Sequence, residues 1–115
     1  MSIYMVDIDG TICDKSTDQT YEQSVPFKDR IAHFNNLFDQ GHEIHYWTAR
    51  GGHSKIDHTE LTHKQLDEWG VKYTSLKMGK PSYDYWIDDK AQNVTSYFDN
   101  ELAKDLETIS QLDLL

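Results

Sequence analysis

The sequence lacks most of the features that would tie a chain to an oxidising compartment, a membrane or nucleic acid. Its one cysteine cannot form a disulfide within the chain, so a reducing cytoplasm is the expected location. No apolar run approaches the roughly 20 residues of a membrane span, and no basic segment followed by an apolar run marks a secretory signal. Only 11 Lys and Arg oppose 20 Asp and Glu, and the net charge is −9. This charge argues against a nucleic-acid partner and against an anionic membrane surface.

Proline and glycine are also scarce, with two Pro and six Gly, so no segment is of low complexity. Hydrophobic residues make up only 37% of the chain, but aromatic residues reach 12%, and large rings bury much area per residue. A length of 115 residues suits one compact domain. We therefore expect residues 1–115 to form a single folded domain.

The apolar pattern alternates between short continuous runs and runs with helical spacing. The continuous runs are typical of strands buried in a parallel sheet, and apolar residues at three- and four-residue steps indicate helices. The alternation predicts an α/β fold with a mainly parallel sheet and helices on both of its faces, in three layers. The expected strands cover 3–8, 42–47, 71–76 and 85–87, and the expected helices cover 26–40, 59–69 and 100–109.

Two pairs of acidic residues follow expected strands, where the sites of such sheets lie. Asp7 and Asp9 end the first strand, and an extended backbone would place both carboxylates on one side of the chain. Such a pair is costly without a cation between its members, although Asp also occurs in turns as a local hydrogen-bond acceptor. Asp88 and Asp89 follow the 85–87 run in the same way. Carboxylate oxygens are ligands that suit Mg²⁺.

Groups suited to phosphate follow the other expected strands. Thr48 offers a hydroxyl after the second strand, and Arg50 offers the forked donors that match a phosphate. Lys80 precedes Pro81, which restricts the backbone before it. Each of these residues by itself would be read as an ordinary surface or turn residue.

In order along the chain, Asp7-Ile8-Asp9-Gly10-Thr11, Thr48, Lys80 and Asp88-Asp89 resemble the four motifs of the haloacid dehalogenase (HAD) superfamily of phosphohydrolases. The resemblance covers residues 3–93. Many members insert a cap domain after the first motif or between the second and third. The gaps from Thr11 to Pro26 and from Thr48 to Lys80 are short here, so the resemblance implies a HAD-like core without a cap domain.

The resemblance also implies roles for these residues. Asp7 would be the nucleophile that forms an aspartyl-phosphate, and Asp9 would be the general acid and base. Thr48 and Lys80 would hold the phosphoryl oxygens. Mg²⁺ would be bound by Asp7, by the backbone carbonyl of Asp9 and by Asp88 or Asp89, and the motifs leave the choice between these two open. The remaining expected substrate contacts are Gly10, Thr11, Ala49 and Arg50.

The resemblance implies Mg²⁺-dependent hydrolysis of a phosphomonoester, because phosphatases and phosphomutases of the superfamily carry Asp at the position of Asp9, whereas transport ATPases carry Thr and dehalogenases lack the acid. Segments 48–51, 79–81 and 85–90 resemble short members linked to capsule or surface-polysaccharide synthesis, which implies a small sugar or sugar-acid phosphate as substrate. The alternatives are a nucleotidase or a polynucleotide 3′-phosphatase, and a catalytically silent regulatory domain of the same fold. Three leucines within 109–115 suggest a contact between copies of the chain, and hence a homo-oligomer.

Overall fold

The computed structural model describes residues 1–15, 20–51 and 56–101. The chain divides into two compact units, Met1–Tyr83 and a second that begins at Asp84. The first unit holds the sheet and two long helices. The expectation of a single domain over 1–115 stays a prediction.

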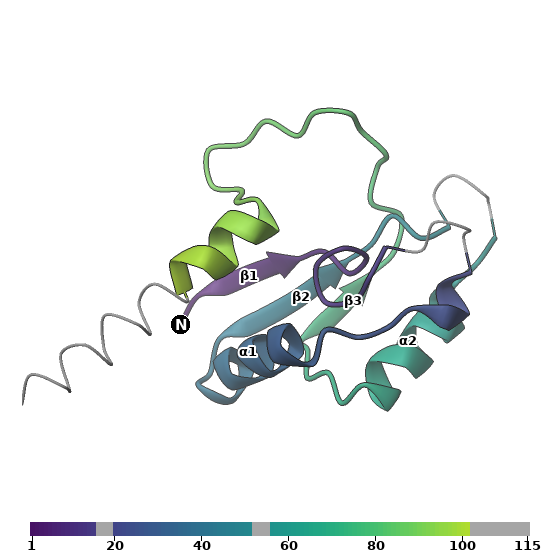
Figure 1. Cartoon of the computed structure of the whole chain (residues 1–115), viewed down its shortest axis with the longest axis horizontal. Helices are drawn as coiled ribbons and strands as arrows, with labels where there is room; N and C mark the ends of the chain where they lie inside the picture. The colour runs from purple at the N-terminus through teal and green to yellow at the C-terminus, as the bar shows by residue number, and fades with distance from the viewer. Residues whose placement is uncertain (16–19, 52–55, 102–115) are drawn as a thin grey trace, which may run out of the picture. The chain divides into compact units, whose positions relative to one another are not determined.

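The first unit is built on three parallel strands in the order β1-β2-β3 (Figure 1). These are β1 (Ile3–Val6), β2 (Glu43–Trp47) and β3 (Ser75–Lys77). Helix α1 (Lys28–Asp39) connects β1 to β2, and α2 (Thr59–Glu68) connects β2 to β3. The predicted parallel α/β sheet is confirmed, and four of its elements lie within two or three residues of their predicted limits.

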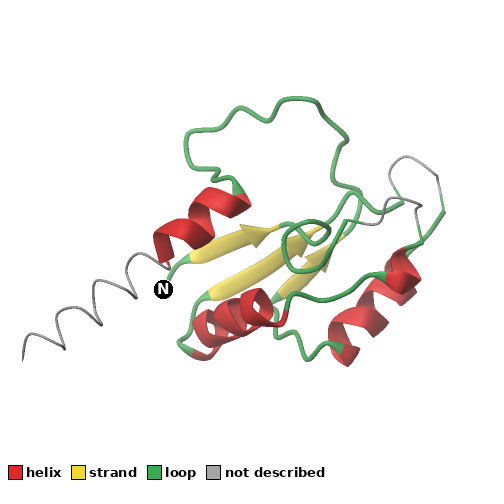
Figure 2. Cartoon of the chain, viewed as in Figure 1, coloured by secondary structure: helices red, strands yellow, loops and turns green. Residues whose placement is uncertain are grey.

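The core of this unit lies between the sheet and the two helices. Val6, Ile44 and Tyr46 are buried on one face of the sheet, and the same side carries both helices in Figure 2. Phe34 of α1 meets Tyr46 edge to face, with ring centroids 6.5 Å apart. Leu66 of α2 is fully buried. Alternation along the strands thus presents one apolar face to these two helices.

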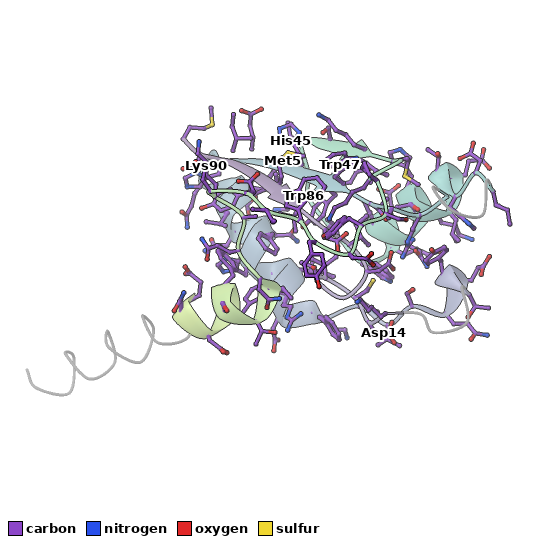
Figure 3. The ribbon with its side chains drawn as sticks, turned by 90° about the horizontal axis from the view of Figure 1, so that it is seen from above. Met5, Asp14, His45, Trp47, Trp86 and Lys90 are labelled. Carbon is purple, nitrogen blue, oxygen red and sulfur yellow. The ribbon has the colours of Figure 1, made fainter. Side chains whose placement is uncertain are left out.

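The opposite face of the sheet carries the alternate residues of the same strands. Met5 lies opposite His45 in the register of β1 and β2, and His45 lies opposite Ser75 of β3. In Figure 3 the side chains of Met5, His45 and Trp47 extend from the sheet on the side away from α1. His45 Nδ1 lies 2.6 Å from Ser75 Oγ, so a hydrogen bond joins β2 and β3 on this face.

The structure corrects the expectations for the third strand and for the 85–87 strand. The third strand is Ser75–Lys77 rather than 71–76, and Ile44 and Thr74 exchange hydrogen bonds just before it. Residues 85–87 form no strand, and Tyr85 and Ile87 are 87% and 95% exposed. A short apolar run becomes a strand only where another strand pairs with it.

The last helix also differs from its expected position. Within the described part of the second unit, helical residues run over 94–101, before the predicted start at 100. Asn93 Oδ1 accepts the Thr95 N–H at 2.9 Å, which is a helix N-cap that the apolar pattern does not reveal. The rest of the predicted helix, and the leucines of 109–115, lie outside the described residues.

Neither gap between motifs holds a cap domain among the described residues. From Thr11 to Pro26 these residues form a single short 3-10 turn, η1 (Tyr21–Gln23). From Thr48 to Lys80 they form only α2 and β3. The prediction of a core without a cap is confirmed. None of the described helices has the length and apolar character needed to cross a bilayer.

Candidate functional site

A tight loop after β1 carries Asp7 and Asp9. Ile8 is fully buried, and its carbonyl accepts the N–H groups of Thr11 at 3.0 Å and Ile12 at 2.9 Å. Gly10 closes the loop with a φ of +84°, in the region where a side chain is strained. The buried isoleucine and the positive φ together hold the loop in one conformation.

Arg30 of α1 clamps the same loop from outside. Its Nη1 donates to the Thr11 carbonyl at 3.2 Å and the Gly10 carbonyl at 3.5 Å, and its guanidinium lies 4.9 Å from the ring centroid of Phe27. The Phe27 N–H donates to the Ile12 carbonyl at 2.8 Å. Arg30 could not be predicted as a site residue from the sequence, because an arginine in the first turns of a helix carries no local signal of the group that it binds.

Lys80 lies beside Asp7, although they follow the two outer strands of the sheet. Lys80 Nζ is 3.9 Å from Asp7 Oδ1, and the Lys80 N–H donates to the Thr48 carbonyl at 2.9 Å. Burial raises the pKa of Asp7, and the Lys80 ammonium opposes that rise. The Asp7 side chain remains 39% exposed, so an incoming group can reach its carboxylate.

Thr48 lies between these two residues in the order of the strands. It is fully buried, and its N–H donates to the Lys77 carbonyl at 3.0 Å. Its Oγ1 accepts the Arg50 N–H at 3.1 Å. The Thr48 hydroxyl keeps its own hydrogen as a donor.

Arg50 is directed at Asp9. Its Nε donates to Asp9 Oδ2 at 3.0 Å and its Nη2 donates to Asp9 Oδ1 at 2.9 Å, in a forked pair. Its Nη1 donates to Thr62 Oγ1 at 3.3 Å and to Gln65 Oε1. Arg50 is only 1% exposed. The N–H groups of this guanidinium already donate to protein oxygens, so they do not face a phosphate. The geometry therefore favours a role for Arg50 other than the expected contact with substrate.

Tyr21 of η1 covers the guanidinium. Arg50 Cζ lies 4.6 Å from the Tyr21 ring centroid, and Gln65 Nε2 donates to the Tyr21 carbonyl. The imidazole of His58 meets the Tyr21 ring edge to face at 4.9 Å. The segment between the first motif and α1 therefore contributes to the surroundings of Arg50.

Cys13 also contacts Asp9. Its Sγ lies 3.5 Å from Asp9 Oδ1, and the residue is fully buried. Burial, with the nearby Asp9 carboxylate, raises the pKa of the Cys13 thiol to about 12. A neutral thiol of this kind serves as a weak donor and not as a nucleophile.

Oxygen donors for a cation occur in both units. Asp7 and the Asp9 carbonyl belong to the first unit, and Asp88 and Asp89 belong to the second. Asp88 Oδ1 accepts the Lys90 N–H at 2.7 Å, which lowers the pKa of Asp88. Among the described residues no three His, Cys, Asp or Glu side chains form a ready-made metal group. One carboxylate and a carbonyl still suit Mg²⁺, which keeps several waters.

A hollow of about 290 Å³ opens beside the residues that follow β2 and β3. Gly51 has a φ of +80°, and the Ile56 carbonyl oxygen lies 2.6 Å from the place its Cβ would take. The wall combines backbone with apolar, acidic and imidazole groups. Its residues are Arg50, Gly51, Ile56, Asp57, His58, Thr59, Met78 and Gly79.

Comparison with known proteins gives structural neighbours only. No family model and no curated protein matches the chain. A crystal structure of a target protein from Vibrio cholerae is similar with a TM-score of 0.75 and 28% identity, over 84% of this chain and 87% of that one.

Two further solved structures share the fold at lower identity. A chain of the Pnkp1/Rnl/Hen1 complex has a TM-score of 0.55 and 20% identity, over 76% of this chain and 30% of that one. D,D-heptose 1,7-bisphosphate phosphatase from B. bronchiseptica, in complex with magnesium and phosphate, has a TM-score of 0.53 and 16% identity, over 79% of this chain and 54% of that one. The chain thus has a HAD-like α/β fold.

Proposed function

We propose that this chain is a Mg²⁺-dependent phosphomonoester hydrolase that works through an aspartyl-phosphate on Asp7. The observation that carries the proposal is the position of Lys80 Nζ, 3.9 Å from Asp7 Oδ1, with the Lys80 backbone hydrogen-bonded to Thr48. An accessible carboxylate next to an ammonium is suited to attack a phosphoryl group whose oxygens that ammonium binds, and the Thr48 hydroxyl is the proposed second donor.

The reaction takes place in two steps. In the first, a carboxylate oxygen of Asp7 bonds to phosphorus as the ester P–O bond breaks, and the departing oxygen takes a proton from Asp9. In the second, water attacks the aspartyl-phosphate, Asp9 takes the water's proton, and Asp7 is released together with inorganic phosphate. Lys80 and Thr48 donate to the phosphoryl oxygens throughout, because these oxygens carry the charge that shifts in the transition states.

The proposed metal is Mg²⁺, held by Asp7, by the Asp9 carbonyl and by Asp88 or Asp89. When bound, it would offset the repulsion between the phosphate and the carboxylates. The ligand set drawn from the second unit is a proposal, as are the substrate contacts of Gly10, Thr11 and Ala49.

The proposed substrate is a small sugar or sugar-acid phosphate. A core without a cap, with a hollow of about 290 Å³ whose wall includes Gly79, the residue before Lys80, suits a leaving group of this size. The net charge of −9 disfavours a polynucleotide. The B. bronchiseptica neighbour is, by its name, a phosphatase of a sugar bisphosphate.

The test is the release of inorganic phosphate from a panel of esters with and without Mg²⁺. The panel contains p-nitrophenyl phosphate, sugar and sugar-acid phosphates, nucleotides and a 3′-phosphorylated oligonucleotide. We expect Mg²⁺-dependent turnover that is fastest for a sugar or sugar-acid phosphate. The Asp7→Asn protein is the matched control for contaminating phosphatases.

Two results would overturn the proposal in different ways. Fastest turnover of a nucleotide or of the oligonucleotide would keep the chemistry and replace the substrate class. No turnover of any ester with Mg²⁺ present would favour the silent regulatory domain.

A further inference from the structure

We infer that Arg50 is a positioning residue that holds the Asp9 carboxylate for proton transfer, and that Asp9 Oδ2 is the oxygen that transfers the proton. The inference rests on the proposed phosphatase function. It assigns Arg50 to the acid–base machinery instead of to the binding of substrate phosphate.

The forked pair determines the plane of the Asp9 carboxylate. Arg50 Nε binds Oδ2 at 3.0 Å and Nη2 binds Oδ1 at 2.9 Å, so two parallel hydrogen bonds hold both oxygens. Such a bidentate pair resists rotation of the carboxylate about its last torsion, which a single bond or a lysine would allow. The Asp9 side chain remains 20% exposed although Arg50 is buried, so the pair does not close Asp9 off from a reactant.

The remaining acceptor positions differ between the two oxygens. Oδ1 also lies 3.5 Å from Cys13 Sγ, so its second lone pair faces a weak donor. Within the described residues, Oδ2 accepts only the Arg50 Nε–H. Each carboxylate oxygen has about two acceptor sites. Oδ2 therefore keeps a free site for the proton that passes to the leaving group.

Arg50 is itself held by polar groups of α2. Thr62 and Gln65 are buried, at 0% and 4% exposure, on the face that α2 turns to the core, where apolar residues are usual. Both accept from Arg50 Nη1, and Gln65 also binds the Tyr21 carbonyl. These buried polar side chains are explained by the need to satisfy one guanidinium.

The proposed role has a kinetic signature that a purely structural role lacks. A general acid matters most when the leaving oxygen is basic and needs a proton, and least when it leaves readily as an anion. A misplaced Asp9 therefore slows phenyl phosphate more than p-nitrophenyl phosphate, because phenolate is the more basic leaving group. Loss of structure slows both esters by the same factor.

The experiment measures kcat/KM for these two esters with Mg²⁺, in the original protein and in four variants. Asp9→Asn sets the pattern for loss of the acid itself. For Arg50→Lys we expect a loss of about 10²-fold on phenyl phosphate and of less than about tenfold on p-nitrophenyl phosphate. Gln65→Met keeps Arg50 and the side-chain volume, and we expect the same selectivity with a smaller loss. It also serves if Arg50→Lys does not fold.

The matched control is Lys72→Ala, which removes an exposed ion pair with Asp39 of 2.8 Å. It should leave the ratio of the two kcat/KM values unchanged. Equal losses on both esters, or no loss, in Arg50→Lys and Gln65→Met would overturn the positioning role while the phosphatase function stands. No hydrolysis of either ester by the original protein would instead count against the proposed function.

Discussion

The ammonium nitrogen of Lys80 lies 3.9 Å from the Oδ1 of Asp7, across the carboxyl ends of three strands. The Lys80 N–H donates a hydrogen bond to the carbonyl of Thr48, the residue that follows β2. The central strand thus helps to hold Lys80 near Asp7, which follows β1. At this distance the two charges attract each other but do not form a direct hydrogen bond. A phosphoryl oxygen can therefore replace the carboxylate as the partner of the lysine.

Lys80→Met should reduce the rate of phosphate release. The side chain keeps much of its apolar stem but loses the charge that would stabilise phosphoryl oxygens, and loss of one such donor costs about 10²- to 10³-fold. Steady-state kinetics on p-nitrophenyl phosphate measure this, with Lys64→Met on the exposed face of α2 as the control. A rate equal to that of the control would contradict the role of Lys80.

Asp7→Asn should abolish turnover while the fold remains. The side chain is 39% exposed, so its amide is tolerated, but an amide does not form the aspartyl-phosphate. Phosphate release and circular dichroism measured together check both halves of the prediction. Retained activity would exclude Asp7 as the nucleophile.

Asp9→Asn should slow the chemistry and destabilise the protein, while it keeps the backbone carbonyl that we propose as a metal ligand. The Asn carbonyl oxygen accepts from Arg50, but its NH₂ group faces the guanidinium, and the buried charge loses its counter-ion. Breaking a buried pair costs about 3 to 5 kcal/mol, and the 20% exposure of Asp9 lowers this to about 2. Urea unfolding measures the stability.

Magnesium binding by the same Asp9→Asn variant is measured by calorimetry. We expect it to be largely unchanged, because the proposed ligand is the Asp9 backbone carbonyl, which the substitution keeps. Loss of metal affinity would mean that the Asp9 carboxylate is itself a ligand.

Gly51→Ala should cost more stability than Gly41→Ala. Both glycines have positive φ, +80° and +96°, and share the strain of about 1 to 2 kcal/mol that an alanine meets there. Only at Gly51 would the new Cβ also meet backbone, with the Ile56 carbonyl oxygen 2.6 Å away. Thermal unfolding of the two variants gives the comparison. Equal losses would show that the backbone at Ile56 moves aside for the new side chain at little cost.

The stability of the protein should fall in alkaline solution, partly through Tyr46. Burial raises the pKa of Tyr46, so above about pH 10 the unfolded chain releases this proton while the folded protein keeps it. The folded state then binds more protons, and the free energy of unfolding decreases as the pH rises. Tyr46→Phe should reduce this decrease, measured as urea unfolding at about pH 7 and 10.5.

The same Tyr46→Phe variant should not lose stability at neutral pH. Tyr46 Oη is buried and finds no hydrogen-bond partner in the part of the chain that the structure describes. Removing an unpartnered buried hydroxyl is neutral or stabilising. A loss above about 1 kcal/mol would indicate a bound water or another partner for the hydroxyl.

Local pattern was sufficient to predict most of the first unit. The strands at Ile3–Val6 and Glu43–Trp47 follow from short continuous apolar runs, and both long helices follow from apolar residues at three- and four-residue steps. The 85–87 strand was wrong because pairing, not composition, decides whether three apolar residues form a strand. The start of the last helix was misplaced because the Asn93 cap lies outside the apolar pattern.

The groups that follow the strands could be predicted from the amino-acid sequence, since strand and turn signals are local. Which of these groups contact one another depends on how distant segments pack. Nothing near Arg50 in the chain indicates that its guanidinium binds Asp9 and that α2 holds it through Gln65. Such contacts arise when packing brings distant segments together, because a buried charge is stable only where the fold supplies its partners.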